Sequence, residues 1–138
     1  MKKKVLIIGG VACGPKAASR IKRLEPDAEV TSLEKGELIS YAGCGLPYYL
    51  SGQVENDDDL MTTPAGVVRN PDFFKMVKDI QVKNRTLAES IDRENKVVKA
   101  VDLLTGKSLE YEYDTLVLSV GSQFKKPPFP GIDLTGVH

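Results

Sequence analysis

The sequence of 138 residues contains no tryptophan, one histidine, two cysteines and no excess of either charge. The single histidine is the last residue, His138, so a zinc site or a histidine-based catalytic triad within this chain is not expected. No basic run is longer than Lys2 to Lys4, so we find no electrostatic basis for binding nucleic acid or a membrane surface. The apolar run that follows, Val5 to Ile8, is too short for a secretion signal or a spanning helix, and we expect a cytoplasmic chain.

The two cysteines, Cys13 and Cys44, are few for a fold held together by disulfides. In a cytoplasmic chain such residues are more often free or catalytic than bridged. The length suits one domain with a modest core and is too short for two ordinary domains.

The first 34 residues follow the pattern of a strand, a helix and a second strand. Val5 to Ile8 is a continuous apolar run, typical of a parallel strand that is covered on both faces. It ends in the glycine-rich turn Gly9 to Gly14, after which Pro15 opens a helix, and residues 28–33 form a second strand that ends at Glu34. This pattern predicts an α/β fold with a Rossmann-like βαβ unit and a parallel sheet.

A dinucleotide suits this unit, because the helix N-terminus presents N–H groups to a pyrophosphate and Glu34 can accept hydrogen bonds from a ribose. Val11 departs from the motif, since it stands where a second glycine usually lets the backbone approach the phosphates. The alternatives are a tight turn between strand and helix that binds nothing, and a Glu34 that is only a solvated acid at a strand end.

The segment Ser40 to Tyr49 has Cys44 at its centre, between two glycines. The sequence Leu-Pro-Tyr-Tyr-Leu follows, so we expect Cys44 in the first turn of a short helix that reaches about Leu50 and is closed by Ser51 and Gly52. A thiol in the first turn of a helix faces unpaired backbone N–H groups, which favour the thiolate, the nucleophilic form. The alternative is a buried, inert cysteine in a glycine-rich loop.

The middle of the chain predicts a loop and a helix. Asp57 to Asp59 is most simply a solvated loop, in preference to a cation site. Asn70 and Pro71 signal the start of a helix whose aromatic residues, Phe73 and Phe74, are expected in the core.

The last third of the chain predicts strands. Residues 87–91, 97–103 and 109–113 have the spacing of a three-stranded antiparallel meander. Residues 114–122 are apolar enough for the parallel sheet, and their end is expected beside the first glycine turn.

Together these residues resemble the amino-terminal part of the flavin-dependent pyridine nucleotide–disulfide oxidoreductases. The sequence is most similar to the branch with a single redox cysteine, which contains coenzyme A disulfide reductases and NADH-dependent persulfide reductases. The likeness rests on the turn Gly9 to Gly14, with valine at position 11 as in this branch, on Ser40 to Tyr49, and on Tyr113 to Ser122 followed by Pro-Phe-Pro-Gly. It covers essentially the whole chain, but only a part of such an enzyme.

The resemblance implies a site for FAD in the βαβ unit and a redox role for Cys44. Four residues of the turn would border the pyrophosphate, two would border the adenosine, one would contact the adenine through its backbone, and two would face the inner side of the dinucleotide. In that order they are Gly9, Val11, Ala12 and Gly14; Glu34 and Lys35; Ala88; and Ser119 and Gly121. Relatives with oxidase or peroxidase activity carry histidine in place of Ala12, which counts against peroxide reduction. Most relatives carry asparagine in place of Gly43, so this chain lacks the amide that makes a contact there in those relatives.

For the substrate, the resemblance implies a disulfide or persulfide that is linked to coenzyme A in the reductases. The positions that hold the phosphates and pantetheine of coenzyme A correspond to Lys16, Arg20, Arg23, Ser40 and Lys78. The alternative for these basic residues is the solvated face of a surface helix. Cys13 has no role in single-cysteine chemistry, and we expect it to pack among small residues.

We therefore expect residues 1–122 to be a partial FAD-binding domain and residues 123–138 to be a proline-rich extended linker towards an NAD(P)H-binding domain that this sequence lacks. The full-length enzyme would be a homodimer in which NAD(P)H reduces FAD and the flavin reduces Cys44. The fragment alone is expected to be inactive. The alternatives are a truncated, inactive nucleotide-binding module and part of a water-forming NADH oxidase.

Overall fold

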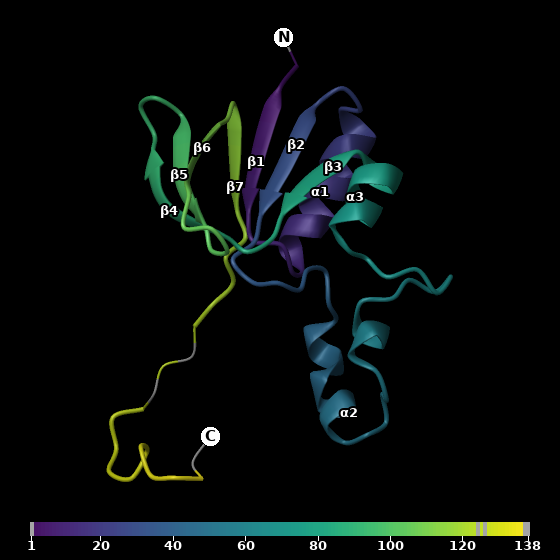
Figure 1. The fold of residues 1–138 in the computed structure, drawn as a ribbon, viewed down its shortest axis with the longest axis vertical. Helices are drawn as coiled ribbons and strands as arrows, with labels where there is room; N and C mark the ends of the chain where they lie inside the picture. The colour runs from purple at the N-terminus through teal and green to yellow at the C-terminus, as the bar shows by residue number, and fades with distance from the viewer. Residues whose placement is uncertain (1, 124, 126, 137–138) are drawn as a thin grey trace.

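The computed structural model describes residues 2–123, 125 and 127–136 (Figure 1). Its elements, in chain order, are β1 (Lys4–Ile8), α1 (Cys13–Leu24), β2 (Glu29–Leu33), a 3-10 turn (Gly43–Gly45), α2 (Leu46–Leu50), a second 3-10 turn (Asp57–Leu60), α3 (Pro71–Lys78), β3 (Ile80–Lys83), β4 (Thr86–Asp92), β5 (Val97–Asp102), β6 (Ser108–Glu112) and β7 (Thr115–Leu118). Four residues of the predicted linker 123–138 lie outside the described part: 124, 126, 137 and the single histidine, 138. The described residues of that segment contain turns and no helix or strand.

Three layers make up the body of the protein (Figure 1). The middle layer is a parallel sheet with the strand order β3-β2-β1-β7. Helices α1 and α3 cover one face of it, and the antiparallel sheet β4-β5-β6 covers the other. The predicted fold class, a Rossmann-like parallel sheet with a three-stranded antiparallel meander, is confirmed.

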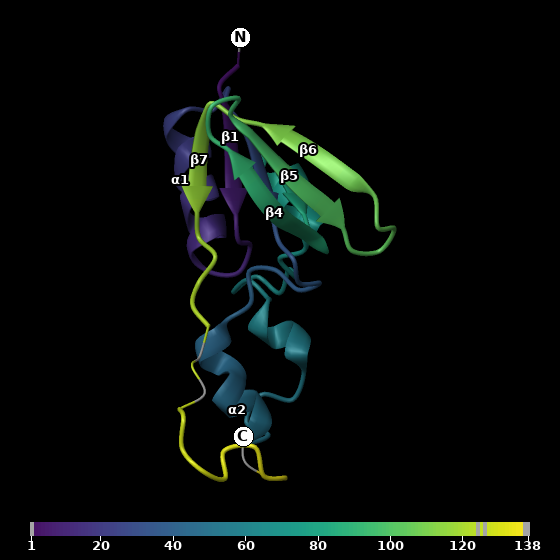
Figure 2. The same cartoon turned by 90° about the vertical axis from the view of Figure 1, so that its left-hand side faces the viewer.

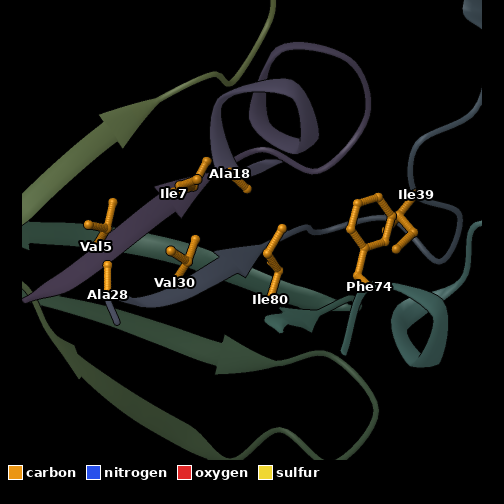
Figure 3. Packing of buried hydrophobic residues seen from close by; sticks show 8 residues of the cluster. All are labelled: Val5, Ile7, Ala18, Ala28, Val30, Ile39, Phe74 and Ile80. Atoms are coloured by element: carbon orange, nitrogen blue, oxygen red, sulfur yellow. The ribbon is translucent and has the colours of Figure 1, made fainter. Parts of the chain in front are cut away.

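The larger core lies between the parallel sheet and its helices (Figure 3). Ile7 from β1, Ala18 from α1 and Ile80 from β3 have no exposed surface. The small side chain of Ala18 lets α1 approach the sheet closely. At the other end of this core, Phe74 of α3 packs against Ile39. The core position predicted for Phe74 is confirmed.

The second core lies between the two sheets. Leu6 of β1 and Leu33 of β2 face Val98 and Ala100 of β5, and all four are buried. Since neighbouring residues of a strand point to opposite faces, Leu6 serves this core while Val5 and Ile7 serve the other. Burial on both faces explains why this strand is apolar throughout instead of alternating.

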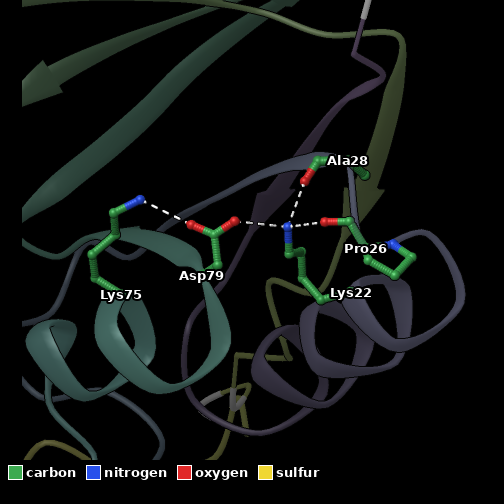
Figure 4. Close-up of polar contacts among 5 residues, drawn as sticks. All are labelled: Lys22, Pro26, Ala28, Lys75 and Asp79. Carbon is green, nitrogen blue, oxygen red and sulfur yellow. Dashed lines mark hydrogen bonds and ion pairs between the residues drawn. The ribbon is translucent and has the colours of Figure 1, made fainter.

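A charged cluster ties the C-terminal ends of α1 and α3 together (Figure 4). The ammonium of Lys22 donates to the backbone carbonyls of Pro26 and Ala28 and pairs with Asp79 at 2.9 Å, and Lys75 pairs with the other oxygen of Asp79 at 3.0 Å. Hydrogen bonds from Lys22 and then Lys75, with the attraction of both charges, lower the pKa of Asp79 from 3.8 to about 2. Asp79 also ends α3 with a left-handed backbone, φ 50°, so it turns the chain into β3.

Residues 41–70, which we call the cysteine arm, extend beyond the end of the sheet at which the parallel strands finish (Figures 1 and 2). The arm contains both 3-10 turns, α2 and a short antiparallel bridge between Thr62 and Val68. Asp57 to Asp59 lie on its surface, as predicted. Throughout the described part of the chain, helices are too short or too polar to span a membrane.

Candidate nucleotide and thiol site

The glycine turn is packed backbone against backbone. Gly9 has φ +113°, and a Cβ at this residue would lie 2.2 Å from the carbonyl oxygen of Ser119. A Cβ on Gly14 would lie 1.8 Å from the carbonyl oxygen of Gly9. The Ser119 hydroxyl lies 2.9 Å from the carbonyl oxygen of Ile8 and 3.1 Å from that of Gly9, so its single proton is shared between these two acceptors. Ser119 therefore fastens the end of β7 to the turn, which confirms that this strand ends beside the turn. The strand itself ends at Leu118, four residues before the predicted end at 122.

The start of α1 leaves room for an anion. The helix begins at Cys13, two residues before the predicted start at Pro15, because Cys13 and Gly14 already have helical geometry. Ala12 at the N-cap offers no capping oxygen, and the first turn contains no acidic residue. Among the described residues, no side chain caps the first N–H groups of this 12-residue helix, and they lie at the positive end of the helix dipole. The turn and this helix end fit the pyrophosphate of a dinucleotide.

Glu34 lies beside the turn at the end of β2. Its carboxylate accepts the N–H of Gly10 at 2.7 Å and that of Gly36 at 2.8 Å. Each carboxylate oxygen has a second lone pair, so these bonds leave acceptors for the hydroxyls of a ribose. The first residue of β4, Thr86, donates its N–H to the carbonyl of Glu34, which brings β4 and its half-buried Ala88 to the same side of the turn. The predicted adenosine residues therefore lie in one region, with Lys35 exposed beside Glu34. Gly121, by contrast, is exposed beyond β7, and none of the described residues outside its chain neighbours lies within 4 Å of where a Cβ would be.

Cys44 is the middle residue of the first 3-10 turn, which runs directly into α2. The helix ends at Leu50 with Ser51 as its C-cap and Gly52 at φ +76°, which confirms the predicted end and its closing residues. The predicted place of Cys44 in the first turn of this helix is wrong, because α2 begins only at Leu46. The thiol is exposed. The alternative required a buried cysteine, and the burial is wrong.

The turn that carries Cys44 rests on a buried piece of the arm, Leu60 and Met61. Ala42 donates its N–H to the carbonyl of Leu60, and Gly45 donates its N–H to the carbonyl of Ala42, both at 2.8 Å. A Cβ on Gly45 would lie 2.6 Å from the side chain of Leu60. The position of the thiol thus depends on the position of Leu60.

A pocket of about 370 Å³ lies between the start of α1, the beginning of the cysteine arm and α3. We call it the cationic pocket, because three basic side chains line it and no carboxylate is among its described lining residues. The basic residues are Lys16, Arg69 and Lys78, and the others are Val11, Ala12, Pro15, Ser19, Ser40, Tyr41, Ala42, Thr63, Phe73 and Phe74. Four of the latter carry hydroxyls. Such a lining favours phosphate groups.

Two features shape the pocket wall. Ser40 has φ 51°, which is unusual for a residue other than glycine, and its N–H donates to the carbonyl of Gly10. This buried residue therefore joins the glycine turn to the cysteine arm. Phe73 meets Phe74 edge to face and lies under the ammonium of Lys78, 5.9 Å from the ring centroid. The core position predicted for Phe73 is only half right, since its half-buried ring also lines the pocket.

The structure brings together three of the five predicted substrate residues, Lys16, Ser40 and Lys78. Arg20 and Arg23 do not line the pocket. They are exposed on α1, one and two helical turns beyond Lys16.

Cys13 is exposed as the first residue of α1. The expectation that it packs among small residues is wrong, because the next residue of the helix, Gly14, and not Cys13, lies against the carbonyl of Gly9.

Sequence reasoning missed Arg69 and Ser19 as pocket residues. Arg69 did carry a signal, because it is the only basic residue between Lys35 and Lys75. Ser19 carried none, since a serine on a helix surface is common.

These features define an α/β dinucleotide-binding unit with an exposed thiol on an arm next to its glycine turn. The sequence model of the pyridine nucleotide-disulphide oxidoreductase family matches residues 3–138. The chain therefore belongs to this family, as the sequence predicted.

Three similar proteins illustrate the range of the family. Coenzyme A disulfide reductase of Staphylococcus haemolyticus is 37% identical over 120 residues, which are 87% of this chain and 26% of that protein. The structure of an NAD-dependent persulfide reductase from A. fulgidus is 45% identical with a TM-score of 0.89, over 96% of this chain and 24% of that one. The water-forming NADH oxidase of Lactobacillus brevis is 31% identical with a TM-score of 0.81, over 96% of this chain and 28% of that one.

The chain thus spans about a quarter of the length of these proteins. The comparisons confirm the predicted oxidoreductase class and the resemblance to an amino-terminal flavoenzyme segment.

Proposed function

We propose that this chain is the amino-terminal, FAD-binding portion of an NAD(P)H-linked reductase of disulfides or persulfides carried by coenzyme A, with Cys44 as the nucleophile. One observation carries the proposal: the peptide that leads into the exposed Cys44, residues 40–42, is a wall of the cationic pocket. A pocket whose lining favours phosphates, and which shares a wall with the segment that leads to an exposed thiol, suits a substrate with both phosphates and sulfur.

The residues near the glycine turn are suited to FAD. Gly9, Val11, Ala12 and Gly14 would hold the pyrophosphate at the start of α1, and Glu34, Lys35 and Ala88 would border the adenosine. Ser119 acts through the turn, because its hydroxyl already serves two carbonyls, and Gly121 would face the cofactor through its backbone. When bound, FAD supplies the two-electron transfer from NAD(P)H that the thiol chemistry requires.

The chemistry of Cys44 is thiol–disulfide exchange. Its thiolate attacks one sulfur of the substrate, a new S–S bond forms between Cys44 and that sulfur, and the second sulfur leaves as a thiolate. Two electrons and a proton then release the bound half as a thiol and return Cys44 to its reduced form. A single protein cysteine suffices, because the mixed disulfide forms with the substrate.

The cationic pocket would hold the phosphates. Lys16 and Lys78 provide charge, Ser40 provides a hydrogen bond, and Phe73 fixes the ammonium of Lys78. Arg20 and Arg23 continue the positive face of α1 beyond the pocket, so they would contact the more distant parts of a ligand as long as coenzyme A.

The test uses the full-length protein with NADH and coenzyme A disulfide. We expect Cys44→Ser to abolish turnover and Cys13→Ser to retain it, with flavin content unchanged in both. Full activity of Cys44→Ser would exclude Cys44 as the nucleophile.

A second candidate is a water-forming NADH oxidase, favoured by the likeness to the Lactobacillus brevis enzyme. Oxygen consumption by the full-length protein without added disulfide distinguishes the two. A lysine- and arginine-lined pocket has no use in oxygen reduction, so we place this candidate second.

Two further properties belong to the proposed reductase. We propose that the full-length protein is a homodimer and that it is located in the cytoplasm.

A further inference from the structure

Arg69 contacts both the cationic pocket and the support of the cysteine turn. Its Nε–H donates to the carbonyl of Met61 at 2.8 Å, and its Nη2 lies 3.5 Å from the carbonyl oxygen of Leu60. Its backbone N–H also donates to the carbonyl of Met61. The guanidinium therefore braces the two residues on which the turn of Cys44 rests.

The same guanidinium has capacity left for a ligand. Of its five N–H donors, two are used in these bonds. Within residues 2–123, 125 and 127–136, no carboxylate forms an ion pair with it, and it shares the pocket with Lys16 and Lys78. An anion in the pocket is thus the natural partner of its charge.

We propose that Arg69 is a positioning residue that couples anion binding in the cationic pocket to the placement of Cys44. A phosphate that pairs with the free donors of Arg69 fixes the guanidinium, which holds the carbonyls of Leu60 and Met61, and Leu60 holds Ala42 and Gly45 on either side of the thiol. The nature of the anion, a phosphate of coenzyme A, rests on the proposed function. The coupling itself does not.

The test measures how a bound phosphate ligand changes the reactivity of Cys44 in the full-length, reduced protein. Adenosine 3′,5′-bisphosphate is the probe, because it carries phosphates but no sulfur, and its affinity is measured by calorimetry. Alkylation of Cys44 by iodoacetamide, a neutral reagent, is followed by mass spectrometry, which separates it from alkylation of Cys13. In the wild type we expect saturating probe to change the alkylation rate by about fivefold or more.

Three variants separate a loss of affinity for the probe from a loss of the change in alkylation rate. Lys16→Gln removes a pocket charge that does not touch Leu60, so we expect weaker binding of the probe but the full rate change at saturation. Arg69→Gln should bind the probe more weakly and lose the rate change even at saturation. Arg69→Lys should regain affinity but not the rate change, because one ammonium cannot replace two fixed donors, and it carries the test if Arg69→Gln does not fold.

A wild-type rate change that persists in Arg69→Gln or Arg69→Lys at saturation would overturn the coupling, as would a wild type that binds the probe without any rate change. If the wild type does not bind the bisphosphate, the coenzyme A assignment fails. Pyrophosphate then replaces the bisphosphate as the probe. The alkylation rates of wild type and the three variants with pyrophosphate decide whether the coupling exists.

Discussion

The glycine turn and the cysteine arm meet at Ser40, but they are built in different ways. In the turn, backbone atoms lie so close that neither Gly9 nor Gly14 has space for a Cβ. In the arm, Tyr48 is 55% exposed and Leu50 is 83% exposed, and the position of the thiol depends on a few main-chain hydrogen bonds around Leu60. The expected cofactor site is thus held rigid by close packing, whereas the expected nucleophile depends on a small support of few contacts.

The largest effect is expected from a side chain in the turn. Gly14→Ala places a Cβ 1.8 Å from a carbonyl oxygen that the flanking strand holds in place, so we expect a loss of roughly 3 kcal/mol or more in unfolding free energy and loss of bound flavin. Chemical denaturation and the visible spectrum measure both. The matched control is Gly43→Ala in the arm, where the nearest atom is a Tyr41 ring carbon at 3.8 Å and a change within about 0.5 kcal/mol is expected. Equal costs at the two glycines would contradict the difference between the regions.

A smaller effect is expected from the support of the arm. Leu60→Ala removes a side chain that is 8% exposed and lies against Gly45, and we expect a loss of about 2 kcal/mol. Alkylation of Cys44 should become faster, because its turn loses this contact. Leu50→Ala, at a highly exposed position of the same arm, should change neither quantity. An unaltered alkylation rate in Leu60→Ala would show that Leu60 does not position the thiol.

The ion pairs between α1 and α3 should make the stability of the body depend on pH. The folded pKa of Asp79 is lowered to about 2, so its contribution is complete above the unfolded value of 3.8 and is lost as the pH falls from there towards about 2. Thermal unfolding midpoints of wild type and Asp79→Asn should therefore differ near neutral pH and converge in this range. Lys75→Met keeps the ion pair between Asp79 and Lys22, so its unfolding midpoint near neutral pH should lie between those of wild type and Asp79→Asn. Curves that stay parallel down to about pH 2 would rule out this role of Asp79.

The smallest effect concerns a polar atom inside the body. The Ser32 hydroxyl is buried in β2 and has no hydrogen-bond partner among the described residues. Ser32→Ala removes an unsatisfied group, so we expect no loss of unfolding free energy and a gain of up to about 1 kcal/mol. Thr31→Ala, on the opposite face of the same strand, is the control for the change in strand propensity. Clear destabilisation by Ser32→Ala alone would mean that the hydroxyl does have a partner in solution.

Much of the architecture was predictable because it depends on local patterns. The run Val5 to Ile8, the turn after it and the alternation in residues 97–103 each specify their own conformation. Ile80 to Lys83 is different. Its short alternation does not reveal its partner, and it joins the parallel sheet beside β2 because Asp79 reverses the chain after α3. The predicted substrate residues were also only partly right. Lys16, Ser40 and Lys78 meet in one pocket, whereas Arg20 and Arg23, on the same helix as Lys16, remain outside it.

The sequence by itself determined the βαβ unit, the short helix after Cys44 and the meander, since backbone geometry at glycines and hydrophobic periodicity act over a few residues. Only the tertiary structure decided that Cys13 is exposed, that β3 enters the parallel sheet and that Arg69 both lines the pocket and donates to the carbonyl of Met61. These outcomes depend on which segments, distant from one another in the sequence, lie side by side in the fold. The physical reason is that burial and ion pairing depend on neighbours that are distant in the sequence, and local preference does not encode them.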